Sequence, residues 1–208
     1  MKRLVGMTAI ALTALAPAAL ADDAGVYVGA SGALSVVSDY EFSNGNANDT
    51  TKSAEFSTGG GALLRGGYDF GSIRTELEIG WRAHDIESIG GQAGIVNDGG
   101  SLNFYTAMVK GAYDFDTGTA VTPYLSLGVG AAFAEGDIGY TAADGERYTK
   151  NYFGVAPAGE IGVGASYALT DDMDLIGGYS FLGAPTDEAN EDQVIQAHSL
   201  QLGLNYGF

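Results

Sequence analysis

The end of the chain alternates strictly between large apolar residues and small or polar ones. Leu200, Leu202, Leu204, Tyr206 and Phe208 are apolar, and the residues between them are polar or glycine. A period of two residues places the apolar side chains on one face of a β-strand. A terminal strand with one apolar face is typical of a membrane-spanning barrel, whose outer surface must contact lipid.

The same alternation recurs along most of the chain. It is clearest over 73–84, where Leu77 and Trp81 share one face and Glu76 and Glu78 share the other. Helical periodicity is hard to find after the first 21 residues. The pattern predicts eight strands, at 24–37, 60–70, 73–84, 101–115, 121–133, 153–169, 173–182 and 194–208.

The links between these strands alternate in length. Short links are predicted at 71–72, 116–120 and 170–172, and long ones at 38–59, 85–100, 134–152 and 183–193. An up-and-down sheet places all short links at one end and all long links at the other. We therefore expect an all-β fold, namely an eight-stranded antiparallel up-and-down transmembrane β-barrel with short periplasmic turns and four long external loops.

Aromatic residues gather near the short links, on the same face as the apolar row. Such a belt is typical of the membrane interface. A soluble β-sandwich or a lipocalin-like barrel is the alternative, but neither explains a terminal aromatic belt. The belt comprises Tyr68, Phe70, Tyr113, Phe115, Tyr167, Tyr206 and Phe208.

One hairpin predicts its own register. Gly71-Ser72 is a good two-residue type II′ turn, because that turn favours glycine at its first central position. The register that follows places Asp69 opposite Arg74 and Arg65 opposite Glu78 on the face away from lipid. Two opposite-charge pairs thus emerge from turn chemistry alone, which supports the register.

The first residues predict a cleaved secretory signal peptide. A basic start at Lys2 and Arg3 precedes an apolar run and an Ala-x-Ala site that ends at Ala21. The run is interrupted by Pro17, which disfavours a single membrane anchor. We expect a signal peptide at 1–21 and a barrel domain at 22–208, located in the outer membrane of a Gram-negative bacterium and reached through the periplasm.

Charge narrows the function. The chain has 26 acidic and nine basic residues, a net charge of −17, and such a balance excludes a nucleic-acid binder. Most of the acidic residues fall in the predicted long loops. These loops could contact divalent cations or a cationic partner, but a solvated rim beside lipopolysaccharide is the simpler interpretation.

The interior of an eight-stranded barrel is only wide enough to be filled by side chains. Charged residues in such a space must pair with one another. We therefore expect a structural ion-pair plug, with a narrow ion path along the same residues as the alternative. The inward-facing charges are Arg65, Asp69, Arg74, Glu76, Glu78, Arg82, Lys110, Asp114 and Glu160.

No pattern points to a catalytic, cofactor or metal site. His198 is predicted to face the outer lipid boundary, as in barrel enzymes that hydrolyse lipid acyl chains with a histidine and a serine. A serine partner on the same face would be two residues away, where Leu200 stands, and Ser199 points to the other side. A lipid A-modifying enzyme is thus the least favoured hypothesis.

A set of short motifs occurs in order along the chain, at 25–29 (GVYVG), 66–70 (GGYDF), 111–115 (GAYDF), 123–130 (PYLSLGVG) and 204–208 (LNYGF). This ordered set resembles the OmpA-type barrel, in its opacity-protein and surface-antigen branch. The resemblance covers essentially all of the mature chain. Where relatives often carry an inward arginine, this chain has Ser180, so the resemblance implies a looser plug there.

The resemblance implies partners and a class of function. Tyr206 and Phe208 match the terminal signal that the barrel-assembly machinery recognises during insertion. The family's roles are envelope integrity, surface antigenicity, adhesion and small passive channels. We expect a monomer that contacts membrane lipid and lipopolysaccharide and has a structural or surface-interaction role, with no cofactor and an external partner that the sequence does not identify.

Overall fold

The computed structural model describes residues 25–38, 40–42, 52–89, 96–141, 146–185 and 194–208. The predicted signal peptide at 1–21 lies outside the described residues, as do parts of all four predicted long loops. None of the described residues forms a helix that is both long and apolar enough to cross a bilayer.

The described residues form ten strands, all in one antiparallel sheet. They are β1 (Gly25–Val37), β2 (Tyr40–Phe42), β3 (Lys52–Phe56), β4 (Gly59–Asp69), β5 (Ile73–Ile89), β6 (Val96–Asp114), β7 (Val121–Thr141), β8 (Arg147–Ala168), β9 (Met173–Pro185) and β10 (Val194–Gly207).

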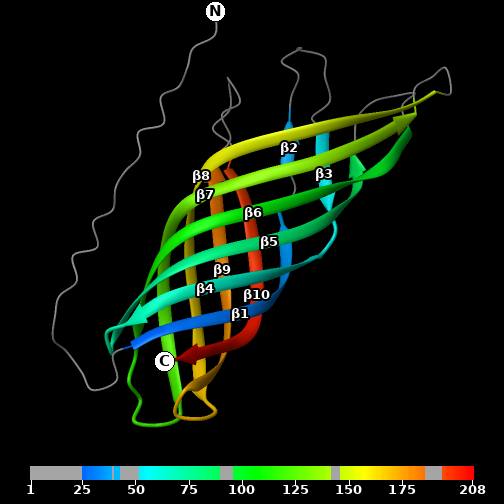
Figure 1. Cartoon of the computed structure of the whole chain (residues 1–208). Helices are drawn as coiled ribbons and strands as arrows, with labels where there is room; N and C mark the ends of the chain where they lie inside the picture. The colour runs from blue at the N-terminus through cyan, green and yellow to red at the C-terminus, as the bar shows by residue number, and fades with distance from the viewer. Residues whose placement is uncertain (1–24, 39, 43–51, 90–95, 142–145, 186–193) are drawn as a thin grey trace, which may run out of the picture.

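Eight of these ten described strands close into a barrel. β10 pairs with β1, β1 pairs with β4, and β4 to β9 follow in chain order around the ring (Figure 1). The other two strands, β2 and β3, form a small hairpin that continues the sheet from β5. The predicted eight-stranded antiparallel barrel is therefore confirmed.

The barrel is apolar outside and charged inside. On its outer face Leu77 is 66% exposed and Val129 is 69% exposed, whereas the inward-facing Glu78 and Arg82 are only 2% exposed. Leu77 and Glu78 are neighbours in the chain, so the two-residue period of a strand separates them onto opposite faces. This inside-out pattern suits a barrel surrounded by lipid.

The register predicted from Gly71-Ser72 is confirmed. Asp69 lies opposite Arg74 and Arg65 lies opposite Glu78 across β4 and β5. Gly71 has a φ of 95°, as the first central residue of the predicted turn requires. The Phe70 N–H donates to the Ile73 carbonyl over 2.9 Å and closes the hairpin.

The C-terminal strand closes the barrel through its predicted face. Leu202 and Leu204 face outward, and β10 pairs with β1 from Val37↔Ala197 to Tyr27↔Gly207. The Phe208 N–H adds a last bond to the Val26 carbonyl at 3.0 Å. The rings of Tyr206 and Phe208 pack edge to face with centroids 5.2 Å apart, at the end of the barrel that carries the short turns.

The predicted long loops at 38–59, 85–100 and 134–152 are in part wrong. The hairpin of β2 and β3 lies within the first of them. Strand pairing of β5 to β8 continues to Ile89, Val96, Thr141 and Arg147, through residues whose side chains lack clear alternation. The backbone ladder continues there because its hydrogen bonds do not depend on which side chains alternate. In Figure 1 the ends of β7 and β8 reach furthest to the right, beyond β9 and β10.

Replacing Gly71 with alanine tests the turn. A positive φ is costly for a residue with a Cβ atom, so we expect Gly71→Ala to lower the free energy of unfolding by about 1 kcal/mol. Gly111→Ala is the matched control, because nothing lies within 4 Å of its added Cβ. Urea unfolding of both variants in lipid vesicles measures the difference, and equal stabilities would contradict the assigned turn.

Candidate functional site

A network of ion pairs fills the part of the lumen nearest the short turns. At its centre the Lys110 ammonium lies 2.6 Å from Glu160 and 3.3 Å from Glu78. Arg65 reaches Glu78 at 3.7 Å and Arg82 reaches Glu160 at 3.8 Å. The two carboxylates therefore each lie between Lys110 and one arginine.

A second group surrounds Arg74. Its guanidinium donates two hydrogen bonds to Asp114, at 2.6 and 2.9 Å, and lies 3.6 Å from Glu76. The rings of Tyr27 and Tyr124 lie 5.9 and 5.2 Å from the guanidinium carbon, within the range of cation–π attraction. Tyr27 also donates to Glu76 over 2.6 Å. Arg74 is thus held by charge and by aromatic faces together.

Asp69 has a different role from the other inward-facing charges. It faces Arg74 in register, but its carboxylate accepts the Gly71 N–H at 2.7 Å and so stabilises the turn. Asp114, from the adjacent strand β6, is the residue that forms the bidentate pair with Arg74. Register alone predicts a pair between Asp69 and Arg74, but Arg74 pairs instead with Asp114 on β6, the strand on its other side.

The fully buried charges in the described part of the lumen are balanced. Four cationic and four anionic side chains are at most 8% exposed. Removing charges from water is costly unless each finds a partner, and equal numbers allow full pairing. The set is Arg65, Arg74, Arg82 and Lys110 with Glu76, Glu78, Asp114 and Glu160.

Neutral side chains complete the network, and the sequence analysis did not identify them. Arg65 donates to Ser31 at 2.8 Å and to Gln201 at 3.0 Å. Arg82 donates to Ser199 at 3.1 Å. The small polar residues opposite the apolar row were the available signal, but their partners depend on how the strands are staggered around the ring.

The loop end of the lumen is closed by an apolar cluster that the sequence analysis also missed. These side chains point inward from six strands and are at most 9% exposed. Because they pack against one another above the ion pairs, the lumen has two layers of different chemistry. The cluster comprises Val37, Phe104, Met108, Ala132, Ala158, Leu182, Ala184 and Ala197.

The two histidines lie on opposite sides of the wall. His84 points inward beside Phe104, and its Nδ1 lies 3.1 Å from the Ser57 carbonyl oxygen. His198 is on the outer face, where its Nδ1 lies 2.6 Å from the Tyr179 hydroxyl oxygen and its ring contacts Phe181. Ser199 faces the lumen, as predicted, so His198 has a tyrosine as its partner and not a serine.

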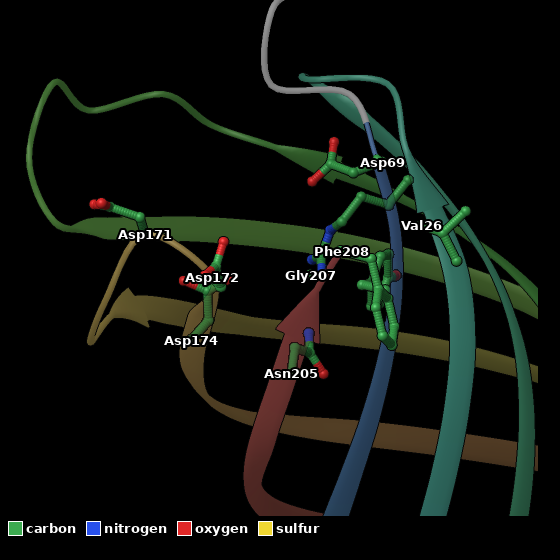
Figure 2. A pocket seen from close by; sticks show the side chains of 11 residues that line it. Val26, Asp69, Asp171, Asp172, Asp174, Asn205, Gly207 and Phe208 are labelled. Atoms are coloured by element: carbon green, nitrogen blue, oxygen red, sulfur yellow. The ribbon is translucent and has the colours of Figure 1, made fainter.

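The mouth beside the short turns holds a cavity of about 380 Å³ (Figure 2). Asp69, Asp171, Asp172 and Asp174 line it together with Asn205. Within the described ranges, no three acidic, histidine or cysteine side chains are placed to hold a metal ion together. Arg74 also borders the cavity, so the mouth ends directly on the ion-pair network.

Comparisons with known proteins agree with this architecture. Residues 6–208 match the model of the outer membrane protein β-barrel domain family. The outer membrane protein PagN of Salmonella typhimurium is 32% identical over 77% of this chain and 74% of its own length.

Solved barrels share the fold at lower identity. Neisserial surface protein A superposes with a TM-score of 0.58 at 20% identity, over 89% of this chain and 99% of that one. The attachment invasion locus protein Ail of Yersinia pestis gives a TM-score of 0.50 at 14% identity, over 88% and 99%.

Removing Lys110 tests the network. Lys110→Met leaves Glu78 and Glu160 buried with one weaker partner each, so we expect a loss of about 3 kcal/mol in the free energy of unfolding. The double variant Lys110→Met/Glu160→Gln also removes one of the two carboxylates that Lys110→Met leaves without its ammonium partner. Its loss of free energy of unfolding is therefore expected to be smaller than the sum of the losses in the two single variants. Additive losses in urea unfolding would show that the two side chains do not interact.

Proposed function

Because the chain belongs to the outer membrane protein β-barrel domain family, we propose that it acts at the cell surface as a closed barrel whose external face contacts other molecules. It resides in the outer membrane of a Gram-negative bacterium, and its relative PagN is likewise an outer membrane protein. The proposed role is adhesin-like or structural.

The filled lumen is the observation that carries this proposal. Paired charges occupy one layer and the apolar cluster occupies the other, with side chains at most 9% exposed. An ion crossing the barrel would have to break buried salt bridges and then pass an apolar constriction, and both steps are costly. Function is therefore assigned to the outside of the barrel, and the narrow pore becomes the less favoured candidate.

The external end offers the surface for such contacts. Strands β5 to β8 continue past the apolar outer band, so an ordered wall projects beyond the lipid. The Yersinia pestis protein of the same fold is named the attachment invasion locus protein. Attachment to other molecules is therefore part of the proposal for this chain. The proposal also includes lipopolysaccharide as the neighbouring lipid, the barrel-assembly machinery as the partner during insertion, and a monomeric state.

Single-channel recording separates the closed barrel from a pore. We expect the refolded protein to insert into planar bilayers without open steps, because the lumen is filled. A large general porin, refolded in the same way, is the positive control. Reproducible steps that disappear in Arg65→Ala or Glu78→Ala would overturn the proposal in favour of an ion path.

The enzyme hypothesis has its own test. We expect no release of acyl chains from lipid A by the purified protein, and no difference between the native chain and His198→Ala, since His198 is bonded to Tyr179. Mass spectrometry of lipid A after incubation measures both. Acyl release that requires His198 would establish catalysis instead.

A further inference from the structure

The outer face of the long strands changes from apolar to polar along one line. The last row that is apolar on all four of these strands crosses β5, β6, β7 and β8. It consists of Trp81, Tyr105, Phe133 and Val155, which pair side by side. Aromatic residues at this level mark the membrane interface. Residues beyond this row therefore lie at the height of lipid headgroups or above them.

The next two rows form a groove on the outside of the wall. Asn103, Glu135 and Phe153 pair in the first row, and Ser101, Asp137 and Asn151 pair in the second. Together with Gly136 and Tyr152 these residues line a cavity of about 420 Å³. A cavity of this size has room for a sugar unit, and the side chains in it combine hydrogen-bonding groups with an aromatic ring.

The polar groups of the groove are held in place by their neighbours. Ser101 donates to the Asp137 carboxylate at 2.5 Å. The Trp81 indole N–H donates to the Asn103 side-chain oxygen at 3.2 Å, which leaves the Asn103 amide N–H groups directed elsewhere. Ser101 thus orients the Asp137 carboxylate as an acceptor, and Trp81 orients the Asn103 amide group as a donor.

The groove carries two carboxylates without a cationic partner among the described residues. Glu135 and Asp137 share one face of β7, and no described lysine or arginine forms a salt bridge with either. Side chains two residues apart on a strand are separated by about 7 Å. That spacing suits one ammonium group with several N–H donors better than a divalent cation, which draws six or more oxygens to within about 2.5 Å.

Phe153 supplies an apolar ledge beside the carboxylates. It lies on the outer face of β8 and is 73% exposed. Pairing between β9 and β8 stops at Gly159↔Gly183, so no described strand flanks β8 beyond that point. The Ala168 N–H bonds to the Ala120 carbonyl, so even-numbered residues of β8 direct their backbone groups to β7. The backbone N–H and C=O of Phe153 therefore face the open edge, next to the ring.

We propose that this groove binds a saccharide unit that carries an ammonium group. The ammonium lies between Glu135 and Asp137, the apolar face of the sugar ring lies over Phe153, and the hydroxyl groups meet Asn103, Asn151 and the open backbone edge. Ammonium near carboxylates and near an aromatic face is favoured by charge-assisted hydrogen bonds and cation–π attraction. A phosphorylated or sulfated sugar is repelled by the same carboxylates.

The inference rests on the proposed function in one respect, that this wall faces the exterior of the cell. Amino sugars reach that place either on a lipid of the same membrane or on a glycan outside it, and both present the same chemistry. Binding to the purified protein tests the groove alone, so its failure is distinguishable from a failure of surface attachment by whole cells.

The single tryptophan of the chain provides the readout, since Trp81 bonds to Asn103 at the margin of the groove. The barrel, refolded in phospholipid nanodiscs at slightly acidic pH, is titrated with a glucosamine oligosaccharide, and calorimetry accompanies the Trp81 fluorescence. The matched ligand is the N-acetylglucosamine oligosaccharide of equal length, which has the same rings without the charge. We expect saturable binding of the first and at least about tenfold weaker binding of the second.

Variants assign the contacts. Glu135→Gln and Asp137→Asn are each expected to weaken binding about tenfold, and Phe153→Ala about fivefold, with recovery in Phe153→Tyr. Asp116→Asn removes one charge from the opposite end of the barrel and keeps the oxygen that caps Gly118, so it is the control for general attraction. Urea unfolding checks that every variant is folded.

Three results would overturn the proposal: no saturable binding by either method, equal binding of the acetylated ligand, or an equal loss in Asp116→Asn. Nanodiscs that contain lipopolysaccharide with free ammonium groups on its sugars identify the source. Competition by lipopolysaccharide assigns the ligand to the neighbouring lipid, and unchanged binding assigns it to a glycan outside the membrane.

Discussion

The hydrogen bonds between β1 and β10 are the constraint on which the rest of the structure depends. Lipid offers no partner for a backbone N–H or C=O, so a sheet in a bilayer must leave no open edge. The terminal strand meets this demand with a ladder from Ala197 to Gly207, extended by the Phe208 N–H. Once the ring is closed, apolar residues must face outward and the polar ones are confined to a narrow interior.

That confinement decides what the barrel can do. Eight charged side chains fit inside only as pairs, and the tyrosine rings beside Arg74 fit because glycines leave room for them. A Cβ atom on Gly67 would lie 2.7 Å from Tyr27, and one on Gly164 would lie 2.5 Å from Tyr124. Together with the apolar cluster at the loop end, these interior side chains stabilise the fold. Contacts with other molecules therefore occur on the outer surface.

The polar groove on the outer surface results from the unequal lengths of the strands. Strands β6, β7 and β8 have 19, 21 and 22 residues, whereas β9 and β10 have 13 and 14. The longer strands carry their pairing past the lipid, where outward positions become polar, and the short β9 leaves the flank of Phe153 open. The parts of these strands beyond the membrane do not alternate between apolar and polar residues. The sequence pattern therefore predicted loops where the backbone continues as strand.

The sequence by itself determined the number of barrel strands, the antiparallel order, the inward and outward faces and the β4–β5 register, because these depend on a two-residue period, on link length and on one glycine turn. Only the tertiary structure decided which charges meet. Lys110 on β6 and Arg82 on β5 both reach Glu160 on β8, and Arg74 bonds to Asp114 and not to Asp69. Closure and stagger bring distant strands together across the lumen, and no local pattern in the chain encodes that geometry.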